Sequence, residues 1–246
     1  MKPRPILVTL EIVALLACAA CSSSPGVHRP ELAVVPPSEI VDFNALYGQN
    51  CAGCHGVDGK GGAAAALANP VFLAIADDTV IHRIASNGVS GTPMPAFARS
   101  AGGMLTEKQI DALVPGIRSW AKPNALGGQT PPPYRAAAPG DPQRGADAYR
   151  TYCSSCHGAN GRGGSKASSI VNGSYLALVS DQQLRTIVIA GRPELGAPDW
   201  RGDVEGRPMS AQEISDVVAW LSRQRPTYPG QPYPNTSTTP ANGGSR

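Results

Sequence analysis

Apolar residues along this chain recur at helical spacing, and no long stretch alternates between apolar and polar residues. The spacing predicts a helix over 78–87 and a matching helix over 181–190, each capped by its first Asp or by the residue before it. A further helix is predicted to start at Thr106 and another at Ser210, where Ser210-Ala211-Gln212-Glu213 has the form of a capping box. The predicted fold class is therefore all-α.

The chain carries one pattern twice. Residues 55–62, His-Gly-Val-Asp-Gly-Lys-Gly-Gly, parallel residues 157–164, His-Gly-Ala-Asn-Gly-Arg-Gly-Gly. The matches continue at a nearly constant offset as far as the last helices, where Leu105 parallels Met209. Such self-similarity indicates two copies of one fold, each with about three helices.

The repeat and the composition between its copies divide the chain into six segments. Between the copies lies a linker rich in Pro, Gly and Ala, which favours an extended, semi-stiff conformation. The end of the chain is rich in Pro, Gly, Ser and Thr and is predicted to be disordered. The predicted segments are a leader at 1–20, a tether at 21–39, a first domain at 40–122, the linker at 123–139, a second domain at 140–226 and the tail at 227–246.

One position breaks the helical pattern of the first copy. Pro115-Gly116 stand where the second copy has Ala219-Trp220. Because a proline inside a helix removes a hydrogen bond, we expect a kink or an early end of the helix there.

Composition limits the classes of function. The chain has 246 residues, with 21 Lys and Arg against 18 Asp and Glu, a net charge of +3. This balance excludes a dedicated nucleic-acid-binding protein, which would be strongly basic. Aromatic residues make up 5% of the chain, while Gly and Pro number 28 and 24. Such a composition predicts long loops and small cores, so we expect something other than aromatic side chains to help fill them.

The first twenty residues have the pattern of a secretory signal. Lys2 and Arg4 precede a mostly apolar stretch that is too short for a transmembrane helix. Cys18 after Leu-Leu-Ala, or Cys21 after Ala-Ala, has the form of a bacterial lipoprotein cleavage site. The alternative is an ordinary signal that is removed together with both cysteines. We expect an exported protein on the periplasmic side of a bacterial membrane, held there by a lipid anchor on one of these cysteines.

The other four cysteines form C-x-x-C-H twice, at 51–55 and 153–157. This is the attachment pattern of haem c. On one helical turn, two thiols three residues apart can reach both vinyl-derived positions of one haem, and the adjacent imidazole can face its iron. A zinc site or a disulfide is the alternative for a C-x-x-C pair. Against both, each pair lies inside its own repeat.

With these motifs inside a helical repeat, both halves resemble class I c-type cytochrome domains, and the chain resembles a dihaem cytochrome c. The resemblance implies helices wrapped round one covalent haem in each half, and therefore two haem c groups. It implies roles for six motif residues: thioether attachment at Cys51, Cys54, Cys153 and Cys156, and axial iron ligation by His55 and His157.

The sixth iron ligand differs between the halves. Met94, flanked by two prolines, matches the axial methionine of the family, and the competing Met104 is expected to pack at the start of the next helix. Ala197 stands at the equivalent position of the second half and cannot bind iron. Three possibilities remain there: Met209 reaches the iron, Lys166 binds it, or the site is open or weakly ligated.

Four other charged or titratable residues draw attention. By resemblance, Lys60 and Arg162 are candidates for contacts to the haem propionates, with ordinary loop cations as the alternative. His28 is expected to be solvated in the tether, and His82 to be a surface histidine rather than a ligand.

The resemblance implies electron transfer, since a haem iron can accept and return one electron without group transfer. We expect transfer between exported or membrane redox partners in a respiratory-type chain: a quinol-oxidising complex, an exported dehydrogenase or a terminal oxidase. An electron carrier or a subunit of an oxidoreductase complex is favoured over a stand-alone enzyme.

The alternative is a dihaem redox enzyme, peroxidase-like or sulfur-oxidising, whose second haem is open. The second half shows no distal histidine and no Arg–Glu pair in an evident catalytic arrangement. Arg192 and Glu194 could take part in such chemistry only if their loop folds over the haem.

Overall fold

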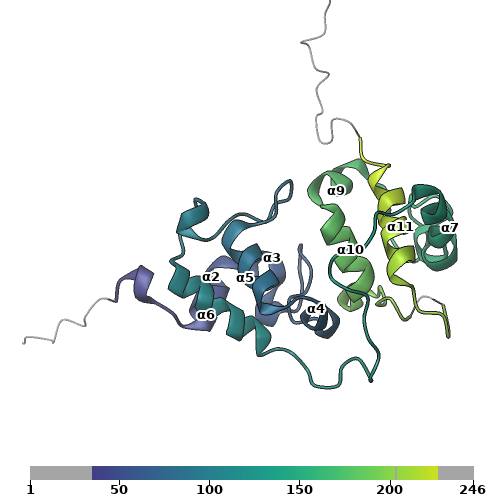
Figure 1. Ribbon diagram of the computed structural model, residues 1–246. Coiled ribbons are helices and arrows are strands. Elements are labelled where there is room, and N and C mark those ends of the chain that lie inside the picture. The colour runs from purple at the N-terminus through teal and green to yellow at the C-terminus, as the bar shows by residue number, and fades with distance from the viewer. Residues whose placement is uncertain (1–34, 203, 227–246) are drawn as a thin grey trace, which may run out of the picture. The chain divides into compact units, whose positions relative to one another are not determined.

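The computed structural model describes residues 35–202 and 204–226, and every regular element there is a helix (Figure 1). This confirms the predicted all-α class. The chain divides into two units, Met1–Pro37 and Ser38–Arg246, and the fold described below is that of the second. The predicted leader and tail, together with Cys18, Cys21 and His28, lie outside the described residues. None of the described helices is long and apolar enough to cross a membrane.

Within the described residues, the two halves repeat the same order of α-helices. The first half contains α2 (Phe43–Asn50), α3 (Ala52–His55), α4 (Pro70–Ile75), α5 (Asp78–Asn87) and α6 (Glu107–Arg118). The second half contains α7 (Pro142–Tyr152), α8 (Ser154–His157), α9 (Gly173–Leu178), α10 (Asp181–Ala190) and α11 (Ala211–Ser222). Short 3-10 helices lie at Pro37–Glu39, Val57–Gly59, Arg99–Ala101 and Pro193–Leu195.

The longer predicted helices have the bounds that the sequence indicated. Helices α5 and α10 span 78–87 and 181–190, each capped by the side chain of the preceding residue, Asp77 or Ser180. Helices α6 and α11 begin after Thr106 and Ser210, and both have a complete capping box. Local capping signals therefore located these helices correctly.

Two short helices, α4 and α9, were not predicted. Each begins after an asparagine, Asn69 or Asn172, whose side-chain oxygen accepts hydrogen bonds from two backbone N–H groups of the first turn. Each helix has six residues, which is too short to show a helical period. The local signals of these helices were the two asparagines and, in α4, Pro70 at the first helical position.

In each half, the first helix meets the last helix at a glycine. In the first half, a Cβ on Gly116 of α6 would lie 2.0 Å from the Phe43 ring of α2. In the second half, a Cβ on Gly145 of α7 would lie 2.0 Å from the carbonyl oxygen of Asp216 and 2.8 Å from Cβ of Trp220, both on α11. In the repeat, Phe43 corresponds to Gly145, and Gly116 corresponds to Trp220. The two halves thus place the bulky side chain on opposite helices.

The last helix of the first half continues through Pro115 to Arg118, so the predicted early end is wrong. Helices α6 and α11 both have 12 residues. Ile117, beyond the proline, is 4% exposed. Packing of this side chain compensates for the single hydrogen bond that the proline cannot donate.

The two halves are in contact through α4 of the first and α10 of the second. The Asn69 side-chain amide donates a buried hydrogen bond of 2.9 Å to the carbonyl oxygen of Ala190. Val71 of α4 belongs to the same apolar cluster as Ile189 and Ala190 of α10. A side chain of the first half therefore completes the core of the second.

Candidate haem-binding sites

Each C-x-x-C-H motif forms a one-turn helix of its own. Cys51 and Cys153 end α2 and α7 with φ angles of −120° and −118°. Helices α3 and α8 follow at once, and each ends at the histidine of its motif. The break in the helix therefore places two cysteines and one histidine on a single turn in both halves.

No disulfide, which a C-x-x-C pair could also indicate, joins any of the four cysteines that the structure describes. Cys54 is exposed and the other three are partly buried. Burial, followed by the neighbouring Cys54, raises the pKa of the Cys51 thiol to about 11. This thiol is therefore protonated at neutral pH.

The two motif histidines have the same hydrogen bond. Nδ1 of His55 lies 2.8 Å from the carbonyl oxygen of Ala65, and Nδ1 of His157 lies 2.8 Å from that of Ser168. A carbonyl can only accept, so Nδ1 donates and the lone pair of the imidazole is on Nε2. This bond fixes both the ring and the tautomer that a metal-binding histidine needs.

The loop after each motif is held by a tight glycine contact. Gly56 and Gly158 have φ angles of 78° and 77°. A Cβ there would lie 2.1 Å from the carbonyl oxygen of Gly61 and 2.4 Å from that of Gly163. The hydroxyl groups of Tyr47 and Tyr149 donate to the carbonyls of Gly56 and Gly158, respectively. Because a side chain would displace the backbone, the glycines found by the repeat pattern are required by the fold.

The candidate sixth ligand of the first half lies in a closed turn. The carbonyl oxygen of Met94 accepts a hydrogen bond from the Val89 N–H at 3.0 Å, and the N–H of Met94 donates one to Thr92 Oγ1 at 3.2 Å. The competing Met104 is 80% exposed, so the expectation that it packs at the helix start is wrong. An exposed thioether is a poor candidate for a ligand in a haem pocket, which leaves Met94 as the better one.

In the second half, Met209 is 2% exposed and belongs to the apolar cluster that contains Ala190 and Trp200. Its N–H donates to the carbonyl of Trp200 at 2.8 Å, as that of Leu105 does to Phe97 in the first half. Cys153 packs against the same cluster. Met209 therefore lies in a core that reaches the motif, at the position predicted from the repeat.

Neither the loop at Ala197 nor Lys166 is as well placed as Met209 to supply a ligand in the second half. Ala197 is tied to Arg192 by two backbone hydrogen bonds of 3.0 Å, which hold a short loop with no ligand atom at the position of Met94. Lys166 is exposed. The assignment of Met209 as the ligand stays a prediction.

The family described as cytochrome C oxidase, cbb3-type, subunit III matches residues 39–115 and 140–221. The chain belongs to this family. Each matched segment contains one C-x-x-C-H turn, so the two segments correspond to the two halves of the fold.

Relatives of this cytochrome include a protein named cytochrome bc1 complex cytochrome c subunit, from Mycobacterium bovis and from Mycobacterium tuberculosis. Each is 25% identical over 205 residues, which cover 78% of this chain and 67% of the relative. Among solved structures, a chain of the Kuenenia stuttgartiensis reducing HAO-like protein complex is similar at 20% identity and a TM-score of 0.42, over 78% of this chain and 100% of that one.

This protein is thus a dihaem c-type cytochrome of a respiratory electron-transfer chain, and the alternative of a dihaem redox enzyme is not favoured. The residues present fit two haem c groups, because each half offers two thiols and one imidazole with a free Nε2 on a single turn. When bound, haem c supplies one-electron chemistry between ferric and ferrous iron.

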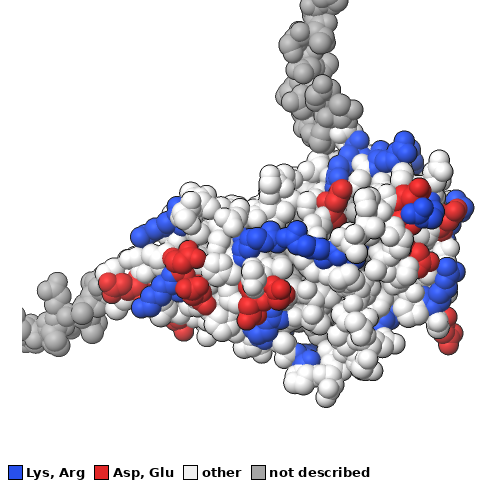
Figure 2. Space-filling model, viewed as in Figure 1, with Lys and Arg blue, Asp and Glu red and all other residues white. Residues whose placement is uncertain are grey.

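The two candidate propionate contacts lie on the surface. Lys60 Nζ is 3.2 Å from Asp58 Oδ2, and both side chains are largely exposed. Arg162 is exposed as well. Their role toward the propionates stays a prediction. Basic and acidic side chains are mixed on the face drawn in Figure 2, in keeping with the small net charge of the chain.

The position of Arg192 could not be predicted from the sequence, which suggested this arginine and Glu194 only as members of a catalytic loop. The structure pairs the two and turns the guanidinium toward the first half. There Nη2 of Arg192 donates to the carbonyls of Gly62 and Ala64 at 3.0 and 3.4 Å. Burial lowers the pKa of His55, and Arg192 lowers it further, against the opposing hydrogen bond to Ala65. The arginine thus favours the neutral imidazole that can bind iron.

Proposed function

We propose that this cytochrome accepts electrons from a membrane quinol-oxidising complex and passes them to a terminal oxidase, on the periplasmic side of a bacterial membrane. An exported dehydrogenase is the second candidate donor. The observation that carries the proposal is the equivalent histidine geometry in two halves that are in direct contact. The names of the family and of the bc1 relatives support a place next to such complexes.

The site residues of this proposal are those of the sequence. Cys51 and Cys54 attach the first haem and Cys153 and Cys156 the second. His55 and His157 bind the irons through Nε2, because Nδ1 of each donates to a backbone carbonyl. Met94 is the sixth ligand of the first haem and Met209 that of the second. With both irons closed by thioethers, the protein exchanges electrons and does not bind small ligands.

A carbon monoxide difference spectrum of the reduced full chain, with both haems attached, tests this assignment. We expect no CO binding in the wild type and binding to one haem in Met94→Ala. The exposed Met104 offers a matched control, since Met104→Ala should stay closed. CO binding by the wild type would contradict a closed site, and CO binding by Met104→Ala but not by Met94→Ala would reverse the choice of ligand.

For the second haem, Met209→Leu separates ligation from packing. Leucine is the residue at this position in the first half, where Leu105 is also buried, and the exchange of Met for Leu in a core costs less than about 1.5 kcal/mol. If Met209 binds the iron, Met209→Leu opens one haem to CO while the chain stays folded. If neither haem of the variant binds CO, Met209 packs in the core and does not bind iron.

The partner is tested by rapid kinetics. The oxidised full chain is mixed with a quinol-oxidising complex and quinol, and haem reduction is followed at the haem absorption bands. Reduction faster than with quinol alone supports the proposal, and an unchanged rate contradicts it. The lipid anchor is tested separately, because Cys18→Ser or Cys21→Ser should release the protein from the membrane fraction.

A further inference from the structure

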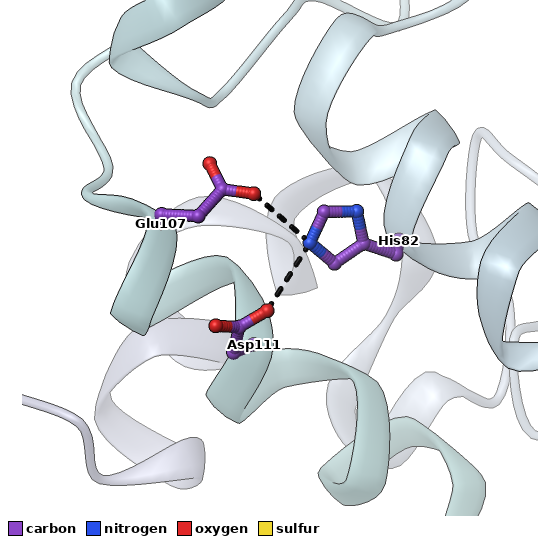
Figure 3. A group of neighbouring side chains, drawn as sticks. All are labelled: His82, Glu107 and Asp111. Atoms are coloured by element: carbon purple, nitrogen blue, oxygen red, sulfur yellow. Dashed lines mark ion pairs between the residues drawn. The ribbon is translucent and has the colours of Figure 1, made fainter.

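A cluster of three possible metal ligands lies on the first half, apart from both haem motifs. It consists of His82 on α5 and of Glu107 and Asp111 on α6 (Figure 3). Nε2 of His82 is 3.2 Å from a carboxylate oxygen of Glu107 and 3.2 Å from one of Asp111. The three ligand atoms all lie within 4.8 Å of one another.

The convergence of these atoms requires either a proton on the imidazole or a metal ion between them. A neutral imidazole with Nε2 unprotonated would direct its lone pair at two carboxylates. Ionised carboxylates can accept hydrogen bonds but cannot donate them. Either a proton on Nε2 or a metal ion must therefore offset the repulsion. The side chains are 34%, 62% and 65% exposed, in the order His82, Glu107 and Asp111, so an ion from solution can reach them.

The spacing suits zinc. In a tetrahedral site, zinc lies about 2.0–2.2 Å from nitrogen and oxygen ligands, which places neighbouring ligand atoms about 3.3 Å apart. The two separations that involve Nε2 of His82 are both 3.2 Å and match this edge, and the two carboxylate oxygens lie within 4.8 Å of each other. The hydroxyl of Ser86, one turn along α5, lies 3.4 Å from Nδ1 of His82 and can accept a hydrogen bond from it or donate one to it. When Nδ1 donates this bond, Nε2 is left free for the metal.

The second half provides an internal comparison, because the corresponding position of its helix crossing holds a cation of its own. Arg185 corresponds to His82, and Ala211 and Ser215 correspond to the two acids. The Arg185 guanidinium is buried and donates to Ser215 Oγ at 3.1 Å and to the carbonyl of Ala211 at 3.4 Å. It also donates to the carbonyls of Pro133 and Tyr134 in the linker, which covers this place.

The first half has a short imidazole and two carboxylates where the second half has a long cationic side chain. We propose that His82, Glu107 and Asp111 bind one Zn²⁺ ion, with water at the remaining coordination position. The imidazole nitrogen favours Zn²⁺ over Mg²⁺, which prefers oxygen ligands alone. This site shares no residue with the proposed haem ligands.

Isothermal titration of the metal-free full chain with Zn²⁺, both haems attached, tests the proposal. We expect saturable binding of one ion that His82→Gln and Asp111→Asn each weaken by roughly tenfold or more. Asp147→Asn is the matched control, because Asp147 is 69% exposed and pairs with a neighbouring arginine in the second half. Its affinity for Zn²⁺ should equal that of the wild type.

Two further readouts complete the test. Haem absorption and thermal unfolding should be unchanged in both variants, which shows that lost binding does not reflect a lost fold. In the reduced protein, NMR signals of the His82 ring should shift on addition of Zn²⁺ and not on addition of Mg²⁺. If His82→Gln binds Zn²⁺ as tightly as the wild type, the cluster is only an ion pair and the proposal is wrong. If Mg²⁺ competes equally, the cluster is an unselective cation site and its assignment to Zn²⁺ is wrong.

Discussion

At the scale of single residues, the fold uses hydrogen bonds to set the state of ionisable groups. The motif histidines are oriented by backbone carbonyls, and Asp216 is the clearest case away from the haem motifs. Its side chain is 4% exposed and accepts bonds from Arg144 Nε at 2.8 Å, the Asp141 N–H at 2.7 Å and Gln212 at 2.8 Å. Burial by itself raises the pKa of Asp216, but these bonds outweigh it and the pKa is lowered.

We predict that Asp216→Asn lowers the free energy of unfolding of the second half by about 1–3 kcal/mol at neutral pH. A carboxylate with a lowered folded-state pKa stabilises the fold above its unfolded pKa of about 4, and this stabilisation is lost as the pH falls. The difference between wild type and variant should therefore shrink below about pH 4. Denaturant unfolding of wild type and variant, at neutral pH and below about pH 4, measures this difference in unfolding free energy. A difference that does not change with pH would contradict the role of the charge.

At the scale of elements, the two halves place the bulky side chain at the crossing of their first and last helices on opposite helices. The first and last helices approach closely in each half, which leaves room for one bulky side chain at the crossing. The first half has Phe43 on α2 against Gly116 on α6, and the second half has Trp220 on α11 against Gly145 on α7. Trp220 then stacks on Tyr149 with ring centroids 4.3 Å apart. In the first half, Trp120 packs edge-on against Tyr47 at 5.0 Å.

This arrangement predicts a reversal of the usual effect of glycine in a helix. Replacement of a helical glycine by alanine ordinarily stabilises by up to about 1 kcal/mol. Gly116→Ala should instead destabilise by about 1–3 kcal/mol, because its methyl group meets the Phe43 ring. Gly48→Ala on α2 is the control, since nothing lies within 4 Å of its Cβ position.

A double-mutant cycle with Phe43→Ala measures the coupling. Gly116→Ala should be much less harmful when Phe43 is already alanine, and chemical denaturation of the four proteins gives the interaction energy. Additive effects would show that the glycine is needed for some reason other than the ring.

At the scale of the whole molecule, Asn69 and Arg192 form hydrogen bonds between the two described halves. Asn69 caps α4 with its side-chain oxygen and reaches Ala190 of the other half with its amide nitrogen. Arg192 extends from the second half to the loop that precedes Ala65, the hydrogen-bond partner of His55. The Arg192 contact therefore lies beside the first C-x-x-C-H motif.

We predict that Asn69→Asp separates the stabilities of the two halves. Aspartate keeps the oxygen that caps α4 but loses the N–H donor and places a carboxylate against the Ala190 carbonyl, at a cost of roughly 1–3 kcal/mol. Calorimetry should show a broadened or split unfolding transition. Asn172→Asp is the matched control, because the exposed Asn172 caps α9 in the same way. Equal transitions in the two variants would contradict the role of the contact.

The sequence by itself determined the features that depend on near neighbours in the chain. The C-x-x-C-H motifs, the repeat, and the helices that begin after Asp77, Thr106, Ser180 and Ser210 follow from spacing and capping over a few residues. Only the tertiary structure decided which carbonyls accept from the motif histidines and which helix carries the bulky side chain at each helix crossing. It also decided that Arg192 contacts the first half and that His82 lies next to Glu107 and Asp111. These depend on residues that are distant in the chain, and no local pattern records which of them the packing brings together.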